Sequence, residues 1–506
     1  MKIDKVLELD ELVEIISKAK STNKIVVHCH GVFDLIHIGH IRHFEEAKKL
    51  GDMLIVTITP DKYVNKGPHR PAFTEKLRAE VIASVDCVNY VAINNWPTAV
   101  KTIEFLRPSI YAKGIEYNDA EKDYSKGIVS EERAIKKIGG ELKFTDNITF
   151  SSSNLINKYL DVLSRDVKEY LTKFSKTTTS EDLIDYLERI KNMKILVIGE
   201  AIIDEYQFGQ SIGKAAKESI IALKYLKTEK FAGGTLAIGN HLSNFCDNVH
   251  LFTLLGDIDS QEDFISKNLS KKVKTLFHYK KDSPTIVKRR FIEEFPLRKL
   301  LEFYIFNDME VDKEQTLEMK KHLLDILPKY DLVIVADFGH GMLNKELINV
   351  IVDKSKFLAV TTQTNASNMG YNVISKYRHV DYICTDEREL RLECQDKNTE
   401  LIKLIPGLSK KIDCKNIIAT HGNRGCITFS SGNSHFIPAF TESVIDTMGA
   451  GDAFLSLTAP LVALDVQMET VGFIGNAVGS MYVKVIGNKD PIDKVSLYKY
   501  VSSLLR

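Results

Sequence analysis

The chain has 506 residues, with 68 Lys and Arg balanced by 68 Asp and Glu. A chain of this length exceeds what one hydrophobic core supports, so we expect two or more domains. The balanced charge gives no electrostatic reason to expect a nucleic-acid or membrane partner. The N-terminus lacks the basic start and apolar run of a signal peptide, and no apolar run approaches the roughly 20 residues of a membrane span.

The seven cysteines are scattered along the chain, with no Cys-x-x-Cys pair. An odd, unclustered set is typical of reduced core thiols rather than of a disulfide framework or a zinc site. We therefore expect a cytoplasmic protein, and the sequence assigns no metal ligands.

Short apolar runs bounded by turns are typical of buried parallel strands, and they occur here in two series. The first series lies at residues 24–31, 52–60, 88–93 and 109–114, with an amphipathic helical stretch at 40–51. The second series lies at residues 193–206, 248–257, 330–339, 380–386 and 415–422. Alternating strands and helices predict α/β folds with doubly wound sheets, whose ligands bind beyond the carboxyl ends of the strands.

A polar, helical stretch at residues 160–193 separates the two series. It is interrupted at 176–182 by "KTTTSED", whose hydroxyl side chains suit the N-cap of a new helix. We predict a first domain over residues 1–165, a linker over 166–180 and a second domain over 181–506.

The segment "GVFDLIHIGH" ends in two histidines, His37 and His40, at the start of the predicted helix. Histidines three residues apart in a first turn point to the same side, and the helix N-terminus attracts anions. Gly39 between them lets a phosphate approach the backbone. Imidazole donors in this setting suit the charge that builds on an attacked α-phosphate, which indicates nucleotidyl transfer. For the bare four-residue motif, a pair of ordinary surface or capping histidines is the alternative.

Residues 24–160 resemble the cytidylyltransferase-like superfamily, and the resemblance extends well beyond the two-histidine motif at residues 37–40. The resemblance lies in "GVFDLIHIGHIRHFEEAKKLGDMLIVTITPD", "KGPHRPAFTEKLR", "YAKGIEY" and "FSSSNLINKYL". Glu116 replaces the usual aspartate of the third stretch. Class I aminoacyl-tRNA synthetases carry a similar histidine motif, but no KMSKS-like loop follows here.

The resemblance implies a Rossmann-like nucleotidyltransferase domain that takes CTP or ATP. His37 and His40 would act on the transferring phosphate, Lys66 and Arg70 would neutralise its charge, and Ser151 and Ser152 would bind it. A solvated loop position is the alternative for Lys66. The other implied nucleotide contacts are Phe33, Asp34, Gly39 and Lys113. Trp96 would lie near the nucleotide or pack in the core.

The string "DTMGAGDAF", residues 446–454, predicts a glycine-rich turn that leads into a helix. Gly449, Ala450 and Gly451 would leave backbone N–H groups facing a phosphate. Asp452 follows in the first helical turn, where it can take a proton from an attacking hydroxyl. Phosphoryl transfer needs little more than positioning and charge neutralisation, commonly with Mg²⁺. The string indicates a phosphotransferase, although a lone Gly-x-Gly-Asp can also be a helix cap.

Residues 191–487 resemble the ribokinase-like (PfkB) sugar kinases. The resemblance implies ATP as the phosphoryl donor, a sugar or sugar phosphate as the acceptor, and Asp452 as the base. It implies sugar contacts from Asp204, Gly233 and Gly234. The nucleotide contacts that it implies are Glu389, Thr420, Gly422, Gly425, Gly449, Ala450, Gly451 and Asn476.

The sequence departs from that family's pattern in three stretches. Leu236 and Ala237 stand where an asparagine usually follows the paired glycines, and Asp386 replaces the asparagine that precedes Glu389. The stretch 360–368 lacks the acidic strand end of heptose kinases. These changes leave the sugar unidentified and the activity of the kinase half open.

The same two modules are fused in the opposite order in the bifunctional heptose kinase/adenylyltransferases. We therefore predict a bifunctional enzyme of nucleotide-activated sugar biosynthesis, with a β lid at residues 208–226 through which two subunits would pair. One alternative is a monofunctional cytidylyltransferase for a polyol or alcohol phosphate, with the kinase fold used for binding or dimerisation. Another is a non-catalytic sensor of nucleotide and sugar.

Overall fold

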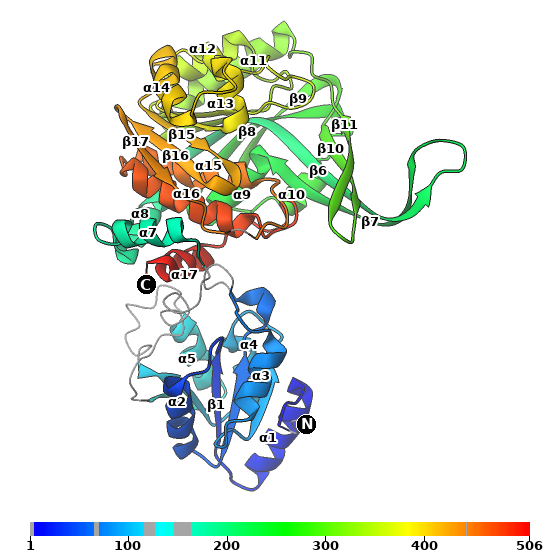
Figure 1. Cartoon of the computed structure of the whole chain (residues 1–506). Helices are drawn as coiled ribbons and strands as arrows, with labels where there is room; N and C mark the ends of the chain where they lie inside the picture. The colour runs from blue at the N-terminus through cyan, green and yellow to red at the C-terminus, as the bar shows by residue number, and fades with distance from the viewer. Residues whose placement is uncertain (1–4, 65–69, 116–126, 146–162, 442, 506) are drawn as a thin grey trace. The chain divides into compact units, whose positions relative to one another are not determined.

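The computed structural model describes residues 5–64, 70–115, 127–145, 163–441 and 443–505. The chain forms two compact units, one of residues 1–164 with 498–506 and the other of residues 165–497. Figure 1 shows the sheet and surrounding helices of each unit. No helix within the described ranges is long and apolar enough to cross a membrane.

The first unit is built on a parallel five-stranded sheet in the order β3-β2-β1-β4-β5. Its strands are β1 (Val26–Gly31), β2 (Met53–Ile58), β3 (Tyr90–Ile93), β4 (Ile110–Gly114) and β5 (Glu141–Thr145). The order reverses direction at β1, so the carboxyl ends of β1 and β4 flank the switch point where such sheets bind ligands.

Helices cover both faces of this sheet, which explains why the central strands β1 and β2 are almost wholly buried. They are α1 (Leu9–Ser21), α2 (Ile38–Lys49), α3 (Glu75–Ala83), α4 (Ala99–Leu106) and α5 (Gly127–Lys137). One core joins α2 and α3 to the sheet through residues such as Phe44 and Ile82, and a second joins α1 through Leu12 and Ile16.

The second unit contains a large sheet in the order β11-β10-β6-β12-β13-β14-β15-β16-β17, with β8 and β9 joined to it through β6. The strands of its main part are β8 (Asn248–Ile258), β9 (Val273–Pro284), β12 (Leu332–Asp337), β13 (Leu358–Thr362), β14 (Tyr382–Asp386), β15 (Asn416–Thr420), β16 (Cys426–Ser430) and β17 (Asn433–Ile437). Strands β9, β8, β6, β12, β13, β14 and β15 run parallel, and β16 and β17 close the edge antiparallel.

One long strand, β6 (Lys194–Lys214), belongs both to this main sheet and to a lid. Its first part pairs with β8 and β12, and from Ala201 onward it pairs with β7 (Ile221–Gly234) and β10 (Ile286–Glu293). β11 (Arg298–Ile305) extends the lid beside β10. The β6–β7 hairpin projects as an arm in Figure 1. The lid predicted at residues 208–226 is therefore confirmed.

Helices lie on both faces of the main sheet of the second unit as well. They are α9 (Thr235–Ser243), α10 (Glu262–Asn268), α11 (Lys313–Ile326), α12 (Lys345–Lys354), α13 (Glu387–Cys394), α14 (Leu401–Ile412), α15 (Ala450–Ala463) and α16 (Met468–Tyr482). Buried residues of α11, α12, α13 and α14 share one core with the sheet, whereas α9, α15 and α16 pack together elsewhere on it. α17 (Lys494–Leu504) ends the chain.

The segment predicted as a linker contains α7 (Arg165–Phe174), which belongs to the second unit. The Phe174 ring stacks on Phe473 of α16 with centroids 4.6 Å apart, which ties α7 to that unit. α8 (Ser180–Arg189) follows, and the Thr179 side chain caps it by accepting from the Asp182 N–H. The hydroxyl-rich "KTTTSED" segment therefore supplies a helix N-cap, as the sequence predicts.

Candidate active sites

The histidine motif of the first unit lies at the N-terminus of α2, immediately after β1. His37 is the N-cap, and its Nδ1 accepts a hydrogen bond from the Gly39 N–H at 3.1 Å. His40 Nδ1 accepts from the His37 N–H at 3.4 Å, and the two ring centroids are 4.0 Å apart. Because both Nδ1 atoms accept, the proton of each neutral imidazole is on Nε2. Both side chains are thus held as Nε2–H donors at a helix end that favours anions.

Phe33 packs against the imidazole ring of His40. Its backbone is left-handed, with φ of 49°, which is uncommon for a residue other than glycine. The phenyl ring meets His40 edge-on at 5.5 Å and Phe44 at 5.1 Å. It is 9% exposed, and we infer that Phe33 positions His40 more than it contacts a nucleotide.

Asp34 organises the loop that precedes α3. Its carboxylate accepts from the backbone N–H groups of Ala72 and Phe73, and Arg70 lies 3.5 Å away as its ion-pair partner. Both charged side chains are almost fully buried. Arg70 was expected to neutralise phosphate charge, and the structure places it against Asp34.

Arg78, which the sequence analysis did not single out, links the loop before α3 to the residues that follow β1 and β2. Its guanidinium donates to the carbonyls of Val32, Thr59 and Phe73 and pairs with Asp61 at 2.6 Å. Arg78 is 1% exposed, so each of these bonds satisfies a buried charge. It therefore fixes the backbone on which Phe33 and Asp34 sit.

Lys113 is near the carboxyl end of β4, one of the two strands that flank the switch point. It pairs with Glu131 of α5 at 3.2 Å. Burial, together with the Lys113 charge, lowers the pKa of three nearby histidines that the sequence analysis passed over. The pKa falls to about 3 for His28 and about 4 for His43 and lies well below its usual value for His30. These histidines are neutral, and we infer that the positive charge of this region comes from Lys113.

Three predicted nucleotide contacts, Lys66, Ser151 and Ser152, lie outside the described residues. Trp96 is partly buried, and its indole packs against the α1 core and edge-on against Phe105 at 5.7 Å. These contacts favour the packing role for Trp96 over the nucleotide role.

The glycine-rich turn of the second unit precedes α15. Gly449 is the N-cap of α15, with φ of 73°, and Asp452 lies in its first turn. The first N–H groups of a helix have no intrahelical acceptor, so those of Gly451 and Asp452 are available to an anion. Burial, followed by the charge of Asp204, raises the pKa of Asp452 to about 7, and Lys288 opposes this shift. A carboxylate of this pKa suits general-base catalysis near neutral pH.

Asp446, the first residue of the same string, anchors the turn to the lid. Its carboxylate accepts from the Tyr206 hydroxyl of β6 at 2.8 Å and from the Gly487 N–H at 3.0 Å. It also pairs with Lys299 of β11 at 2.6 Å. The turn is thereby connected to two lid strands.

Replacing Gly449 with alanine is expected to destabilise the second unit, whereas Gly451→Ala should not. A Cβ at Gly449 would lie 1.9 Å from the Asn488 Oδ1 and would force an alanine into a left-handed conformation, while a Cβ at Gly451 meets nothing within 4 Å. Left-handed strain alone costs about 1–3 kcal/mol, and alanine inside a helix is roughly 0.5–1 kcal/mol better than glycine. Thermal unfolding of the two variants tests this; equal melting temperatures would contradict it.

Asp204 and Gly233, which the sequence predicts to contact the sugar, form an adjacent corner. The Asp204 carboxylate accepts from Arg290 of β10 at 2.5 Å and from the Asn488 Nδ2 at 2.9 Å. A Cβ on Gly233 would lie 2.2 Å from the Asp204 Oδ2, so only glycine allows this approach. Gly234 follows as the N-cap of α9. The structure thus brings Asp204, Gly233 and the Gly449 turn together around Asn488.

Asn488 supplies an amide close to the paired-glycine motif, which lacks the asparagine that usually follows it. Leu236 and Ala237, which stand in its place, are buried in α9 and belong to the core. Asn488, 284 positions after Asp204, instead supplies an amide that donates to the Asp204 carboxylate. The departure at "GGTLA" therefore does not leave this corner without an amide.

Lys288 of β10 is the other group that sequence analysis missed. It is 5% exposed, and burial lowers its pKa, against the opposing charges of Asp204, Glu200 and Asp452. Its ammonium group lies 5.7 Å from the Phe338 ring centroid and makes no ion pair with a described carboxylate within 4.0 Å. A buried cation of this kind favours an anionic group on the substrate or on ATP.

Several of the predicted nucleotide contacts lie at the carboxyl end of β14. Asp386 caps α13, and Glu389 accepts from the N–H groups of Asp386 and Thr364, each at 3.1 Å. Burial raises the pKa of the Cys384 thiol of β14, and the charges of Glu389, Asp386 and Asp452 add to this shift. Burial, followed by Asp386, raises the pKa of Glu389 to about 8.

The remaining predicted nucleotide contacts line the β15–β16 turn and α16. Thr420 ends β15, and Gly422 and Gly425 bound the turn after it. Asn476 donates through its amide to the carbonyls of Ile437 and Pro438, at 2.9 and 3.0 Å. The Asn476 side chain therefore holds the chain after β17, whereas the sequence predicts a nucleotide contact.

Comparison with known protein families agrees with this geometry. The model described as pfkB family carbohydrate kinase matches residues 192–495, more than half of the chain. The chain belongs to this family. The cytidylyltransferase-like model matches residues 28–204. The predicted combination of a cytidylyltransferase-like part followed by a PfkB part is confirmed.

Curated relatives match the N-terminal part of the chain. The chain is 34% identical over 162 residues to the "Bifunctional protein HldE" of Geobacter metallireducens, an alignment that covers 31% of each chain. It is 40% identical over 119 residues to the protein of that name from Helicobacter pylori, covering 23% of this chain and 25% of that one. The chain thus spans less than a third of the length of these relatives.

Solved structures resemble the second unit. Phosphofructokinase-2 from Escherichia coli, in complex with potassium, matches with a TM-score of 0.50 and 14% identity, covering 61% of this chain and 99% of that one. A complex of the same enzyme with substrates and products matches with a TM-score of 0.50 and 13% identity, covering 60% and 98%. At this identity the likeness shows the fold, and the predicted α/β kinase fold with a β lid is confirmed.

Proposed function

We propose that the second unit transfers the γ-phosphoryl group of ATP to a hydroxyl of a sugar or sugar phosphate. The observation that carries this proposal is Asp452 in the first turn of α15, whose carboxyl pKa is raised to about 7 by burial and then by the charge of Asp204. The substrate hydroxyl would donate its proton to Asp452 as it attacks the phosphorus atom. Asp204, fixed by Arg290 and Asn488, would accept from other sugar hydroxyls.

Oxygen donors at the end of β14 suit Mg²⁺, which binds through one or two carboxylates and the phosphates of its substrate. Asp386 and Glu389 would hold the ion, and a cation there would favour the charged form of Glu389, whose pKa burial raises to about 8. When bound, Mg²⁺ would neutralise phosphate charge. The residues of the chain would still orient the hydroxyl and accept its proton.

We propose that the first unit joins a phosphorylated sugar to ATP or CTP and releases pyrophosphate. The Nε2–H groups of His37 and His40 at the α2 N-terminus would donate to the α-phosphate as charge develops on it. The name shared by the curated relatives, "Bifunctional protein", supports two activities in one chain. The kinase would then make, or help to make, the acceptor for the transferase.

Two assays on the full chain test these proposals. Pyrophosphate release is measured with ATP and with CTP against sugar 1-phosphates and polyol phosphates, and ADP release against sugars and sugar phosphates. ADP formation with a sugar, together with pyrophosphate formation from a sugar phosphate, supports the bifunctional enzyme. Pyrophosphate release only with CTP and a polyol phosphate, without ADP formation, would indicate the monofunctional alternative.

A homodimer through the lid is a further part of this proposal. Ile212, Ile220, Ile221 and Tyr225 of the β6–β7 hairpin are each at least 60% exposed. Exposed apolar side chains gathered on one hairpin favour burial against a partner. Solution scattering that gave the mass of a single chain would overturn the dimer.

A further inference from the structure

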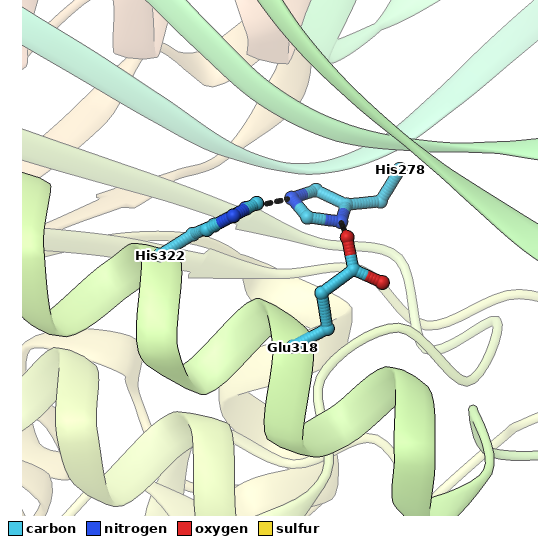
Figure 2. Close-up of side chains that lie close together, drawn as sticks. All are labelled: His278, Glu318 and His322. Carbon is cyan, nitrogen blue, oxygen red and sulfur yellow. Dashed lines mark hydrogen bonds and ion pairs between the residues drawn. The ribbon is translucent and has the colours of Figure 1, made fainter.

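A cluster of histidine and glutamate side chains lies between the edge strand β9 and helix α11 of the second unit. His278 comes from β9, and Glu318 and His322 come from α11 (Figure 2). Ligand atoms of the three side chains lie within 4.8 Å of one another. None of the three belongs to either proposed active site.

The helix spacing explains why two of the three side chains meet. Glu318 and His322 are four residues apart on α11, and side chains at this spacing lie on one face of a helix. In Figure 2 both point from α11 toward His278. Met319 and Leu323, the next residue after each, bury the adjacent face of α11 in the core, which fixes the position of the helix against the sheet.

The distance between the two imidazoles also suits a shared metal ion. His322 Nδ1 and His278 Nε2 are 3.4 Å apart, a long hydrogen bond between two nitrogens. Two nitrogens that each lie about 2.0–2.1 Å from a tetrahedral Zn²⁺ are separated by roughly 3.3–3.4 Å. The rings are already spaced like two corners of such a site.

Glu318 completes the set from the solvent side. One ligand atom from each of the three side chains lies within 4.8 Å of the others. The Glu318 Oε1 also lies 3.7 Å from His278 Nδ1, which is the ring nitrogen that does not face His322. Because its side chain is 62% exposed, while that of His278 is 7% exposed, the carboxylate can turn toward an ion held at His278 Nε2. A buried imidazole, a second imidazole and an exposed carboxylate make a three-ligand set that leaves a position open to water. Imidazole nitrogens favour zinc and neighbouring transition metals over Mg²⁺ or Ca²⁺, which prefer oxygen.

We infer that His278, Glu318 and His322 form a binding site for a divalent transition-metal ion, with Zn²⁺ as its representative. The ion would join the edge strand β9 to α11. The site stands apart from the acidic residues at the end of β14, which are oxygen donors and belong to the kinase proposal.

The test is Zn²⁺ titration of the chelator-treated full chain by calorimetry, in excess Mg²⁺ to occupy oxygen-rich sites. His322→Ala is the main variant because His322 is exposed on α11, and Glu318→Gln is the second. Removing a ligand should weaken binding by more than about tenfold, at least as much as outer-shell changes do. His435→Ala is the matched control, since His435 pairs only with Glu469, at 3.6 Å, and belongs to no three-ligand group within the described ranges.

The expected result is one equivalent of Zn²⁺ that the wild type and His435→Ala bind and that His322→Ala loses. The visible absorption of Co²⁺ bound in place of Zn²⁺ should disappear in the same variant. Equal stoichiometry and affinity in the wild type and His322→Ala would overturn the inference, and so would equal weakening by His322→Ala and His435→Ala.

Discussion

Replacing Asp452 with asparagine is expected to reduce phosphorylation of the sugar by about 10²–10⁴-fold, the contribution of a positioned general base. Asparagine keeps the size of the side chain but cannot accept the proton of the attacking hydroxyl. Because the base must be deprotonated and the pKa of Asp452 is raised to about 7, the wild-type rate should rise as the pH increases through about 7. It should level off above that value.

The same variant should be more stable than the wild type near neutral pH. An aspartate whose pKa is raised from 3.8 to about 7 binds more protons in the folded state than in the unfolded state between those pH values. Its contribution to stability therefore falls as the pH rises from about 4 to 7. Three pKa units correspond to roughly 4 kcal/mol, and a gain of about 1–3 kcal/mol is expected because the partly buried carboxylate keeps some contact with water.

Steady-state ADP release and thermal unfolding, both followed from pH 5 to pH 8, measure these two effects. The difference in melting temperature between Asp452→Asn and the wild type should be small at pH 5 and largest at pH 8. Pyrophosphate release by the first unit is the internal control and should not change. An Asp452→Asn variant that kept the wild-type kinase rate, or whose stability did not differ from the wild type at any pH, would contradict the proposed role of Asp452 as the general base.

Replacing His40 with glutamine, or His37 with asparagine, is expected to reduce pyrophosphate release by about 10²–10³-fold, the effect of losing one donor to a developing anion. Asparagine at position 37 preserves an N-cap side chain that can accept from the Gly39 N–H, so α2 should remain folded. The loss would then come from the missing imidazole donor. ADP release by the second unit should be unchanged in both variants.

Burial lowers the pKa of His37 below its usual value of 6.5. The neutral Nε2–H form therefore predominates at pH 7, and nucleotidyl transfer should not fall as the pH rises from 6.5 to 8. A rate that dropped through this range would indicate that the imidazolium is the active form. Far-UV circular dichroism of the two histidine variants would show whether α2 and the rest of the fold are retained.

The sequence predicted the features that depend on short stretches of chain. The strand runs predicted β1 to β4 of the first unit and β6, β8, β12, β14 and β15 of the second, but missed the parallel strands β5, β9 and β13. The strings "HIGH" and "DTMGAGD" each predicted a helix N-terminus with its polar side chains. These predictions hold because helix capping and strand periodicity involve neighbours a few residues apart, whose chemistry can be read directly from the sequence. The hydroxyl-rich cap before α8 is of the same kind.

Only the tertiary structure decided which side chains from distant segments share a site. Asn488 reaches Asp204 across 284 residues, Arg70 pairs with Asp34, and Arg78 donates to carbonyls that follow β1 and β2. His278 meets Glu318 and His322 only because α11 packs beside β9. No local pattern encodes such pairs. These pairs form when strands and helices pack together around a core. Burial then determines both the partner and the pKa of each charged group.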